Sequence, residues 1–506
     1  MLASVQSAVV RGVDGHAVRV EVHVSNGLPG FTVVGLPDAS CREARDRVRA
    51  ALLSSGLAWP LRRVTVNLAP SGLPKAGAGL DLAIAVGLLV ASGVVPEAAI
   101  AHTAFVGELG LDGAVRPVPG LLGVVDAIRT DEVVVPATGF AEASVLGRHR
   151  VRAVPDLATL VRVLVGEEPW PDPPPPPPPC SPPPPPDLAD VVGQPVGRRA
   201  VEVAAAGGHN LLLCGPPGAG KTMLARRLPG LLPPLTQEVA VVATRVHSAA
   251  GEPLPATGLL TNPPFRSPHH GASMAALVGG GSTRLRPGEV ALAHGGVLFL
   301  DELAEFPPSV LDALRQPLEE GVIRVARAVA TVQFPADFLL VAATNPCPCG
   351  FAFTPGACRC SDAARRRYAR RLSGPLLDRF DLRVIVGRTE AGALAGPVGE
   401  GTAEVAARVR TARELAAARG VVANAALVGA ALDRHAPLSS AGRAILERAL
   451  ATGRLSARGF QRVRRVARTL ADLDGEAGPL GGGHVALALQ LRAERVVPAD
   501  VGEGVA

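Results

Sequence analysis

The chain has 506 residues, of which 48% are apolar and 19% charged, and its formal net charge is +6. This composition excludes an intrinsically disordered chain, and so small a positive excess does not by itself indicate a nucleic-acid partner. The longest apolar run, Leu82–Val95, has 14 residues, fewer than the roughly 20 needed to cross a bilayer. Residues 1–17 lack the pattern of a signal peptide. We therefore expect a soluble, cytoplasmic protein with no membrane partner.

The N-terminal part of the chain, residues 1–165, mixes strand-like and helical patterns. Val18–Val24 alternates apolar and polar residues, and Arg63–Leu68 is rich in residues that favour strands. Ser40–Leu53 has the apolar spacing of a helix. Together these patterns predict a separate domain that contains both helices and strands.

Residues 166–186 are predicted to be a linker. From Asp172 to Pro186 the sequence is almost pure proline, interrupted only by Cys180 and Ser181. Proline favours the extended polyproline conformation, so this stretch is expected to act as a semi-rigid spacer. A ligand for a proline-binding domain is the alternative, but the position between two folded regions already explains the tract.

A glycine-rich loop follows the short apolar strand predicted at Asn210–Cys214. Its sequence, GPPGAGKT, fits the phosphate-binding pattern G-x4-G-K-[ST] in full, and a helical pattern follows it. Backbone amides in such a loop face the phosphates of ATP, the lysine reaches the β- and γ-phosphates, and the threonine hydroxyl binds Mg²⁺. A chance match is the alternative, which the flanking strand and helix patterns disfavour. The loop residues are Gly215, Pro216, Pro217, Gly218, Ala219, Gly220, Lys221 and Thr222.

Two further predicted strands end in polar residues that complete such a site. The run Val297–Leu300 leads into Asp301, expected to hold Mg²⁺, and Glu302, expected to orient and polarise the attacking water. The run Phe338–Ala343 leads to Asn345, which is placed to sense the γ-phosphate. A structural strand ending in two acids and a turn asparagine are the alternatives. Taken together, the motifs predict ATP hydrolysis with Mg²⁺.

Four cysteines cluster directly after Asn345, in the pattern C-x-C-x8-C-x-C. Four thiolates can enclose a tetrahedral zinc ion, so a structural Zn²⁺ site is predicted, with reduced thiols in a loop as the alternative. For His269 and His270 we favour a loop or pore role over metal binding, because no acidic or cysteine partner is nearby in the sequence. The cysteines are Cys347, Cys349, Cys358 and Cys360.

Several long segments make the chain resemble the ComM/YifB family of magnesium-chelatase-like AAA+ ATPases. The resemblance implies an α/β AAA+ core at 187–395, a parallel sheet flanked by helices, and a C-terminal helical lid at 396–506. It also implies a hexameric ring of identical chains that acts on DNA as a helicase in branch migration, in recombination or natural transformation. The segments are FRSPHHGAS (Phe265–Ser273), GEVALAHGGVLFLDELAEF (Gly288–Phe306), ATNPCPCG (Ala343–Gly350), SGPLLDRFDL (Ser373–Leu382) and SARGFQRVRRVARTLADL (Ser456–Leu473).

The same resemblance assigns roles to four arginines. Arg379 looks like an arginine finger that reaches the γ-phosphate of the neighbouring subunit, and Arg458 resembles the sensor-2 arginine of the lid. A surface ion pair between Asp378 and Arg379 is the alternative. The segment Gly321–Phe334 reads as a β-hairpin, and Arg324 and Arg327 on it are candidates for contacts with the DNA backbone. Solvated positions on an exposed hairpin are the alternative for both.

The N-terminal part resembles the Lon protease proteolytic domain, which has an α+β fold like ribosomal protein S5 domain 2. The segments that carry this likeness are LPKAGAG (Leu73–Gly79) and FVGELGLDGAVRPVPG (Phe105–Gly120). Gly79 stands where that family has its nucleophilic serine, and residues 122–124 are apolar where it has its lysine base, so proteolysis is not expected. Lys75, one of only two lysines, is expected to make a structural contact or to face DNA.

Two other functions fit the motor core. It also resembles a magnesium-chelatase motor subunit, which drives metal insertion into a porphyrin, and a protein-remodelling ATPase that works without DNA is a further alternative. The Lon-like domain together with the cysteine cluster favours the ComM/YifB reading over the chelatase subunit. A DNA-binding scaffold without turnover conflicts with the presence of Glu302 and Arg379.

Overall fold

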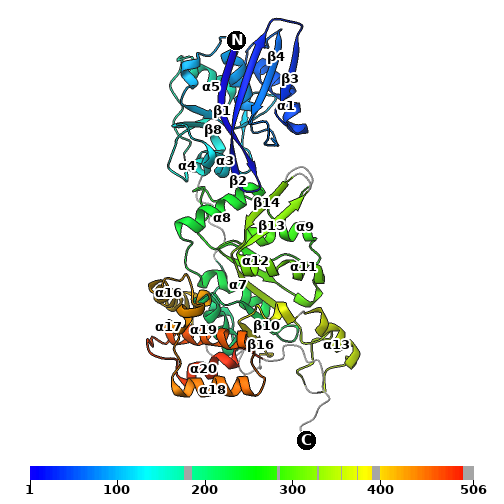
Figure 1. The fold of residues 1–506 in the computed structure, drawn as a ribbon, viewed down its shortest axis with the longest axis vertical. Helices are drawn as coiled ribbons and strands as arrows, with labels where there is room; N and C mark the ends of the chain where they lie inside the picture. The colour runs from blue at the N-terminus through cyan, green and yellow to red at the C-terminus, as the bar shows by residue number, and fades with distance from the viewer. Residues whose placement is uncertain are drawn as a thin grey trace.

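The computed structural model in Figure 1 places a mixed sheet at one end of the molecule, a parallel sheet in the middle and a group of helices at the other end. The structure describes residues 1–175, 185–281, 285–327, 330–354, 356–372, 374–389 and 399–493. Residues 176–184, which make up much of the predicted proline spacer, lie outside the described residues. Within the described part of the chain, no helix combines the length and the apolar character that crossing a membrane requires.

The N-terminal sheet has seven strands in the order β3-β4-β2-β1-β5-β8-β9. The alternation predicted for Val18–Val24 is confirmed, because its four valines are buried under the helices that cover one face of the sheet. The strands are β1 (Leu2–Arg11), β2 (Asp14–Ser25), β3 (Gly30–Val34), β4 (Arg63–Ala69), β5 (Thr103–Phe105), β8 (Glu132–Pro136) and β9 (Arg150–Val154), with a separate pair β6 (Glu108–Leu109) and β7 (Val115–Arg116). The helices are α1 (Ala39–Ser54), α2 (Asp81–Ala91), α3 (Leu121–Ala127), α4 (Phe140–Ser144) and α5 (Leu157–Leu164).

The central sheet has five strands in the order β11-β12-β15-β10-β16, and each neighbouring pair is parallel. The inner strands are continuous apolar runs, as expected for a parallel sheet covered on both faces. The strands are β10 (Leu211–Cys214), β11 (Phe265–Arg266), β12 (Val297–Leu300), β15 (Leu339–Thr344) and β16 (Leu382–Ile385). Around them lie α6 (Pro195–Gly207), α7 (Lys221–Leu231), α8 (Gln237–Ala250), α9 (Met274–Val278), α10 (Glu289–Leu292), α11 (Pro308–Ala313), α12 (Arg315–Glu320), α13 (Asp362–Arg371) and α14 (Gly374–Leu377).

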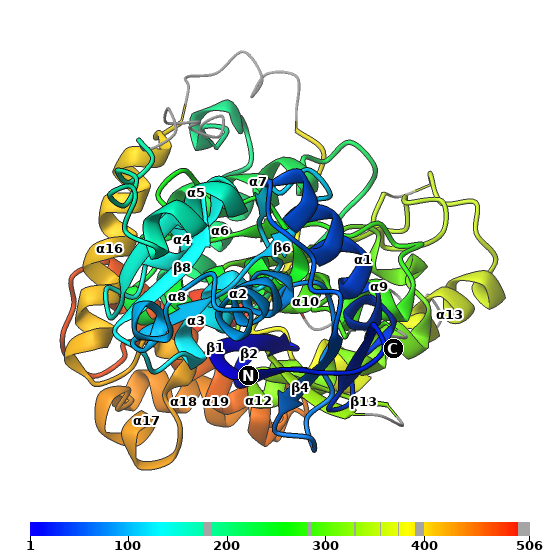
Figure 2. The ribbon, with the colours of Figure 1, turned by 90° about the horizontal axis from the view of Figure 1, so that it is seen from above.

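The C-terminal part is helical, as predicted. Its longest helices share one hydrophobic core with α6 and the β10–β16 side of the sheet, so they form a cap over that side. Seen from above, α16 and α13 lie on opposite sides of the molecule (Figure 2). The helices are α16 (Thr402–Ala418), α17 (Gly429–His435), α18 (Ser440–Ala451), α19 (Ala457–Leu473) and α20 (Gly482–Gln490).

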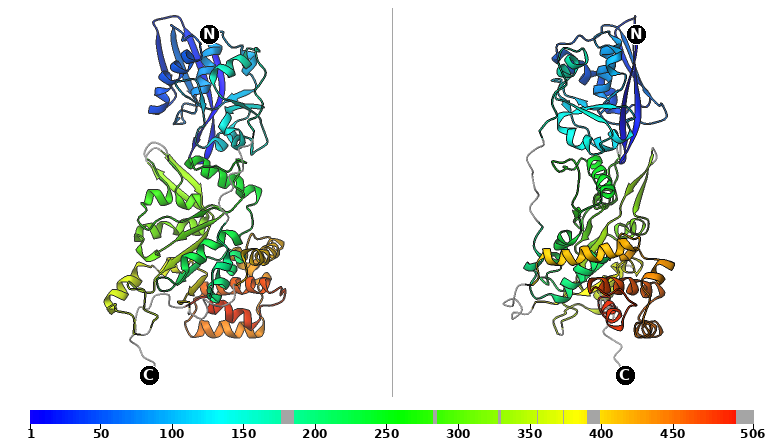
Figure 3. Two further views of the ribbon diagram at one scale, coloured as in Figure 1. Left: turned by 180° about the vertical axis from the view of Figure 1, so that it is seen from behind. Right: turned by 90° about the vertical axis from the view of Figure 1, so that its left-hand side faces the viewer.

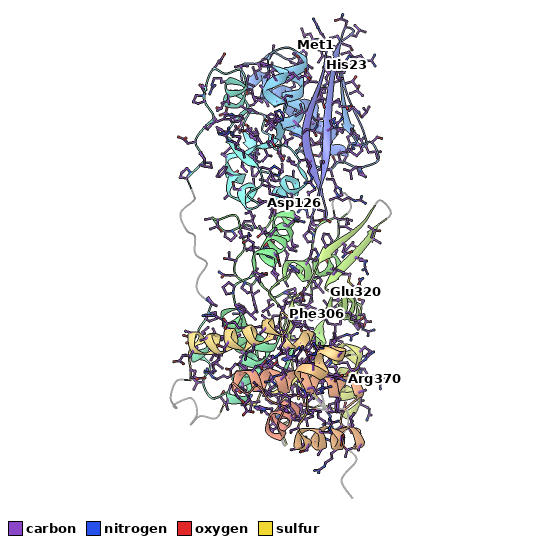
Figure 4. The ribbon with its side chains drawn as sticks, turned by 60° about the vertical axis from the view of Figure 1, so that its left-hand side comes forward. Met1, His23, Asp126, Phe306, Glu320 and Arg370 are labelled. Carbon is purple, nitrogen blue, oxygen red and sulfur yellow. The ribbon has the colours of Figure 1, made fainter. Side chains whose placement is uncertain are left out.

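The N-terminal domain rests on α8 and on the hairpin formed by β13 (Val322–Arg327) and β14 (Ala330–Pro335), as two views agree (Figure 3). Arg245 of α8 forms an ion pair with Asp126 of the N-terminal domain at 2.6 Å, and Asp126 is labelled in Figure 4. The turn between β1 and β2 packs against β14: a Cβ on Gly12 would lie 2.1 Å from Val332 Cγ1, and the next residue, Val13, is buried in the same core as Val332. The hairpin predicted at Gly321–Phe334 is thus confirmed, and its inner face is shared with the N-terminal domain.

Candidate nucleotide site

The glycine-rich loop joins β10 to α7 at the carboxyl edge of the central sheet. Gly218 and Gly220 have φ angles of 77° and 86°, in the left-handed region that disfavours residues with a side chain. A Cβ on Gly215 would lie 2.1 Å from the carbonyl oxygen of Val386, so this glycine lets two backbone segments approach closely. The loop ends where α7 begins at Lys221, and a helix N-terminus beside glycine amides is a site suited to phosphate.

Lys221 connects three parts of this edge. Its Nζ donates hydrogen bonds to the carbonyl oxygens of Gly215 at 2.6 Å and Pro216 at 3.0 Å, and to Asn345 Oδ1 at 3.1 Å. Burial lowers the pKa of Lys221, and the negative charges of nearby acids act in the opposite direction. The ammonium group therefore sits in a desolvated position where its hydrogen-bond partners among the described residues are neutral oxygens. An anionic phosphate would be a stronger partner.

The two predicted Mg²⁺ ligands are in contact. Thr222 Oγ1 donates to Asp301 Oδ2 at 2.8 Å, across the gap between α7 and the end of β12. A hydroxyl and a carboxylate oxygen side by side are ligands that suit Mg²⁺. The geometry of the described residues therefore fits the ion.

Glu302 has an unusual backbone and a partner that the sequence did not reveal. Its φ angle is 52°, one of two positive values outside glycine among the described residues, and such strain is often found at functional sites. Its carboxylate, 54% exposed, lies 3.1 Å from Nδ1 of His270. The His270 ring lies 4.1 Å from the His269 ring between centroids, tilted by 33°, and meets Phe306, labelled in Figure 4, edge-on.

The signal that could have revealed His270 is the order of the strands. His270 follows β11, and β11 pairs with β12, so the residues after both strands emerge at the same edge of the sheet. Strand order cannot be read from one sequence, and no acidic residue stands near His270 in the sequence, so the sequence indicates only a loop or pore role for it. The structure thus brings together the loop, Lys221, Thr222, Asp301, Glu302 and Asn345, and adds His270.

Arg379 lies away from the nucleotide loop, and Arg458 lies near Arg379. Arg379 lies three residues before β16. Its carbonyl oxygen accepts a hydrogen bond from Nδ2 of Asn210 at 3.1 Å, and Asn210 directly precedes β10. The glycine-rich loop leaves the other end of β10, roughly 15 Å away for a strand of this length. Arg458, exposed in the first turn of α19, is close enough to Arg379 for its charge to add to burial in lowering the pKa of Arg379. Arg379 therefore does not lie at the nucleotide site of its own chain.

The four cysteines converge. Their sulfur atoms all lie within 4.8 Å of one another, and the Sγ distances are 3.4 Å between Cys347 and Cys349 and 3.8 Å from each of these to Cys358. Sulfurs in a tetrahedral site with metal–sulfur bonds of about 2.3 Å are about 3.8 Å apart. The donor set, with Cys360 as its fourth member, therefore fits a zinc ion.

The thiols also perturb one another. Burial would raise the pKa of Cys349, but hydrogen bonds from backbone amides and neighbouring thiols bring it down to about 6. Burial and hydrogen bonds with Cys349 and Cys358 raise the pKa of Cys347 to about 12. Four thiolates at this spacing would repel one another, so a cation is needed for all of them to ionise.

The hairpin arginines are only partly described. Arg324 pairs with Glu320 at 2.5 Å, and half of its side chain is exposed; Figure 4 labels Glu320 at the base of the hairpin. Arg327 is the last residue of β13, opposite Ala330, and its side chain lies outside the described residues. Arg324 is therefore accessible, although a neighbouring carboxylate offsets its charge.

Lys75 is fully buried, and its Nζ donates to the carbonyl oxygen of Pro70. Burial lowers its pKa. Of the two expectations for Lys75, the one that places it facing DNA is therefore wrong, and the structural contact is the one observed. Gly79 lies beside Val118, and Leu122 and Val124 are buried in α3, so the surroundings of the Lon-like position are apolar.

Comparisons with known proteins agree with this architecture. Three family models match the chain: "Subunit ChlI of Mg-chelatase" over residues 20–139, "Magnesium chelatase, subunit ChlI" over 187–394 and "Magnesium chelatase, subunit ChlI C-terminal" over 399–492. The chain is 44% identical to the competence protein ComM of Haemophilus influenzae, with 97% of both chains covered. The chain belongs to the ComM/YifB family of magnesium-chelatase-like AAA+ ATPases.

Two further relatives cover nearly all of the chain. An uncharacterized protein of Mycobacterium tuberculosis is 50% identical, with 96% of this chain and 97% of the relative covered. The uncharacterized protein YifB of Salmonella typhimurium is 43% identical, with 94% of both chains covered. The likeness to this family therefore includes the N-terminal domain as well as the motor core.

Proposed function

We propose that this protein is an ATP-hydrolysing ring motor that moves on DNA. The observation that carries the proposal is the convergence of Lys221, Thr222, Asp301, Glu302 and Asn345 at one edge of the sheet. In this proposal Lys221 and the loop amides bind the phosphates of ATP, and Asn345 contacts the γ-phosphate. Glu302 orients the attacking water and accepts its proton.

Mg²⁺ is the proposed cofactor, held by Thr222 and Asp301. Bound there, it would supply positive charge that offsets the charge of the phosphate oxygens. The chain's own residues provide the rest: the loop amides fix the phosphates, and Asp301 also accepts a hydrogen bond from the amide of Glu302 at 3.0 Å, which ties the carboxylate to the catalytic segment.

We propose that the ring is a homo-hexamer, that Arg379 serves the neighbouring subunit as an arginine finger and that Arg458 is the sensor-2 arginine of the lid. The distance of Arg379 from its own nucleotide loop supports a role in trans, since a residue at the amino edge of β10 cannot reach phosphates at its carboxyl edge. An arginine finger contributes roughly 10³–10⁵ in rate in P-loop enzymes. Hydrolysis would then require assembled subunits.

We propose that Cys347, Cys349, Cys358 and Cys360 hold a structural zinc ion. The chain segment that carries them touches the nucleotide site, because a Cβ on Gly350 would lie 2.4 Å from Cδ of Pro217 in the glycine-rich loop. Zinc there would fix the backbone on the carboxyl side of Asn345. Its proposed role is thus to stabilise the sensor and the loop.

DNA as the partner rests on two observations. The relative from Haemophilus influenzae is named a competence protein, and the β13–β14 hairpin presents an exposed Arg324. We propose that Arg324 and Arg327 contact the phosphate backbone with little sequence preference, and that the motor acts in recombination or natural transformation. We also propose that residues 1–165, 166–186, 187–395 and 396–506 act as the N-terminal domain, linker, core and lid of this motor.

ATP turnover by the full chain, with and without forked or single-stranded DNA, tests the proposal. Lys221→Ala should lower turnover roughly 10²-fold or more, because it removes a donor to the transferred phosphate. Arg379→Ala should lower it by a similar or larger factor while leaving ATP binding intact. Stimulation by DNA that weakens with added salt would support the motor. Turnover indifferent to DNA would favour a chelatase-type or protein-remodelling function instead.

A further inference from the structure

Arg379 already has a carboxylate partner within its own chain. Its Nη2 forms an ion pair with Glu319, near the end of α12, and only 20% of the arginine side chain is exposed against 51% of the glutamate. The guanidinium Nε is buried and makes no hydrogen bond to the described residues. The arginine is therefore held from one side only and retains an unused donor.

The surroundings of this pair are positively charged. Burial lowers the pKa of Arg379, and the charges of Arg462, Arg458 and Arg315 lower it further. Two of these arginines have carboxylates of their own, since Arg462 pairs with Asp381 and Arg315 with Asp312. Within this part of the described chain, Glu319 is the carboxylate in contact with Arg379, so it offsets much of the charge that Arg379 could offer to an anion.

We propose that Glu319 is a positioning residue that holds Arg379 within its own subunit until a neighbouring copy of this chain presents the phosphates of a bound nucleoside triphosphate. This inference rests on the proposed role of Arg379 in trans. A guanidinium binds carboxylates and phosphates through the same pair of parallel donors, so Arg379 must release Glu319 to bind a phosphate in that way. The ion pair thus competes with assembly.

The exchange has a measurable consequence for assembly. Because each subunit must break one ion pair when its arginine engages the neighbour, the pair weakens the nucleotide-dependent interface. Removing the charge of Glu319 should therefore strengthen assembly with ATP without changing the chemistry in the assembled ring. The pair joins a half-exposed carboxylate to a mostly buried arginine, so its strength should lie at the upper end of the range for surface ion pairs. That strength corresponds to about a fivefold change in an equilibrium constant.

The experiment compares Glu319→Gln, Glu319→Asp and the matched control Glu320→Gln in the full chain, beside Arg379→Ala and Lys221→Ala. Glu320 is the adjacent residue on the same helix and pairs with Arg324 instead. ATP turnover per subunit is measured against protein concentration, and kcat and KM are determined at saturating protein. For Glu319→Gln, the protein concentration at half-maximal turnover should fall about fivefold with kcat unchanged. Glu319→Asp and the control should behave like the unaltered protein.

The outcomes separate the inference from the proposed function. If Glu319→Gln leaves the midpoint unchanged, or lowers kcat as Arg379→Ala does, Glu319 does not compete with assembly and the inference is wrong. If Arg379→Ala turns over normally while Lys221→Ala does not, the ATPase stands but Arg379 has no role in trans, and the inference fails with it. If the unaltered protein shows no turnover above Lys221→Ala, the proposed function itself is refuted.

Discussion

Replacing Cys358 by serine tests whether the cysteine cluster supports the nucleotide site. Three Sγ distances in the cluster, 3.4, 3.8 and 3.8 Å, match a four-thiolate zinc site with sulfurs about 3.8 Å apart. Structural zinc sites in small peptides bind with apparent free energies of about 10–16 kcal/mol at neutral pH. Loss of one of the four ligands should weaken this binding. We therefore expect the ion to dissociate when the protein is diluted to the nanomolar concentrations of an enzyme assay.

The expected effect on activity follows from two contacts. Cys347 is buried two positions beyond Asn345, and the backbone at Gly350 packs against Pro217. Without zinc, both the asparagine that accepts a hydrogen bond from Lys221 and the loop itself lose their support. We expect ATP turnover to fall about tenfold or more, since small misplacements at an active site can cost up to about 10² in rate.

The assay measures zinc per chain by elemental analysis and ATP turnover on the same preparation. Cys41→Ala is the matched control, because Cys41 is a buried cysteine of the N-terminal domain that lies outside the cluster. The control should retain one zinc ion per chain and normal turnover. The reasoning would be refuted if the unaltered protein were fully active without zinc, or if Cys358→Ser lost the ion and kept its turnover.

Two further substitutions test contacts described above. His270→Ala removes the partner of Glu302 and should change basal ATP turnover several-fold at nearly constant KM for ATP. His269→Ala is the control, because the carboxylate pairs with His270, and it should leave turnover unchanged. Equal effects of the two substitutions in steady-state assays would contradict a specific role for His270. Arg245→Asp should weaken the packing of the N-terminal domain on α8 by about 1 kcal/mol, measured as faster limited proteolysis between the domains. Adding Asp126→Arg should restore the resistance to proteolysis, because it re-forms a pair of opposite charges. If the double variant is cleaved as fast as the single one, the pair does not hold the domain.

Local features of the site could be predicted from the sequence because they depend on residues that are close together along the chain. The spacing from Gly215 to Thr222 determines the loop, and an apolar strand that ends in Asp301 places an acid at the edge of a parallel sheet. Both motifs meet as expected, with Thr222 and Asp301 2.8 Å apart. The cysteines also meet, because two C-x-C pairs separated by eight residues can fold back on themselves.

Contacts that depend on strand order or domain packing could not be predicted. His270 meets Glu302 only because β11 lies beside β12. The burial of Lys75 could not be foreseen, because a loop lysine usually points to solvent. The packing of Gly12 against Val332 joins residues far apart in sequence, and no single-chain pattern specifies which surface of a motor an N-terminal domain will cover.

The position of Arg379 constrains how subunits can assemble if it serves a neighbour, as we propose. Asn210 lies at the amino edge of the sheet, where its side chain accepts from the amide of Leu340 at 2.9 Å and donates to the carbonyl oxygen of Arg379 at 3.1 Å. From Asn210, β10 continues to the nucleotide loop at the opposite edge. Each chain thus offers a phosphate edge at one end of its strands and an arginine edge at the other. Such a chain must associate head to tail, and a head-to-tail interface either closes into a ring or continues as a filament. ATP turnover that saturates with protein concentration, together with particles of one fixed size, would distinguish the ring from the filament.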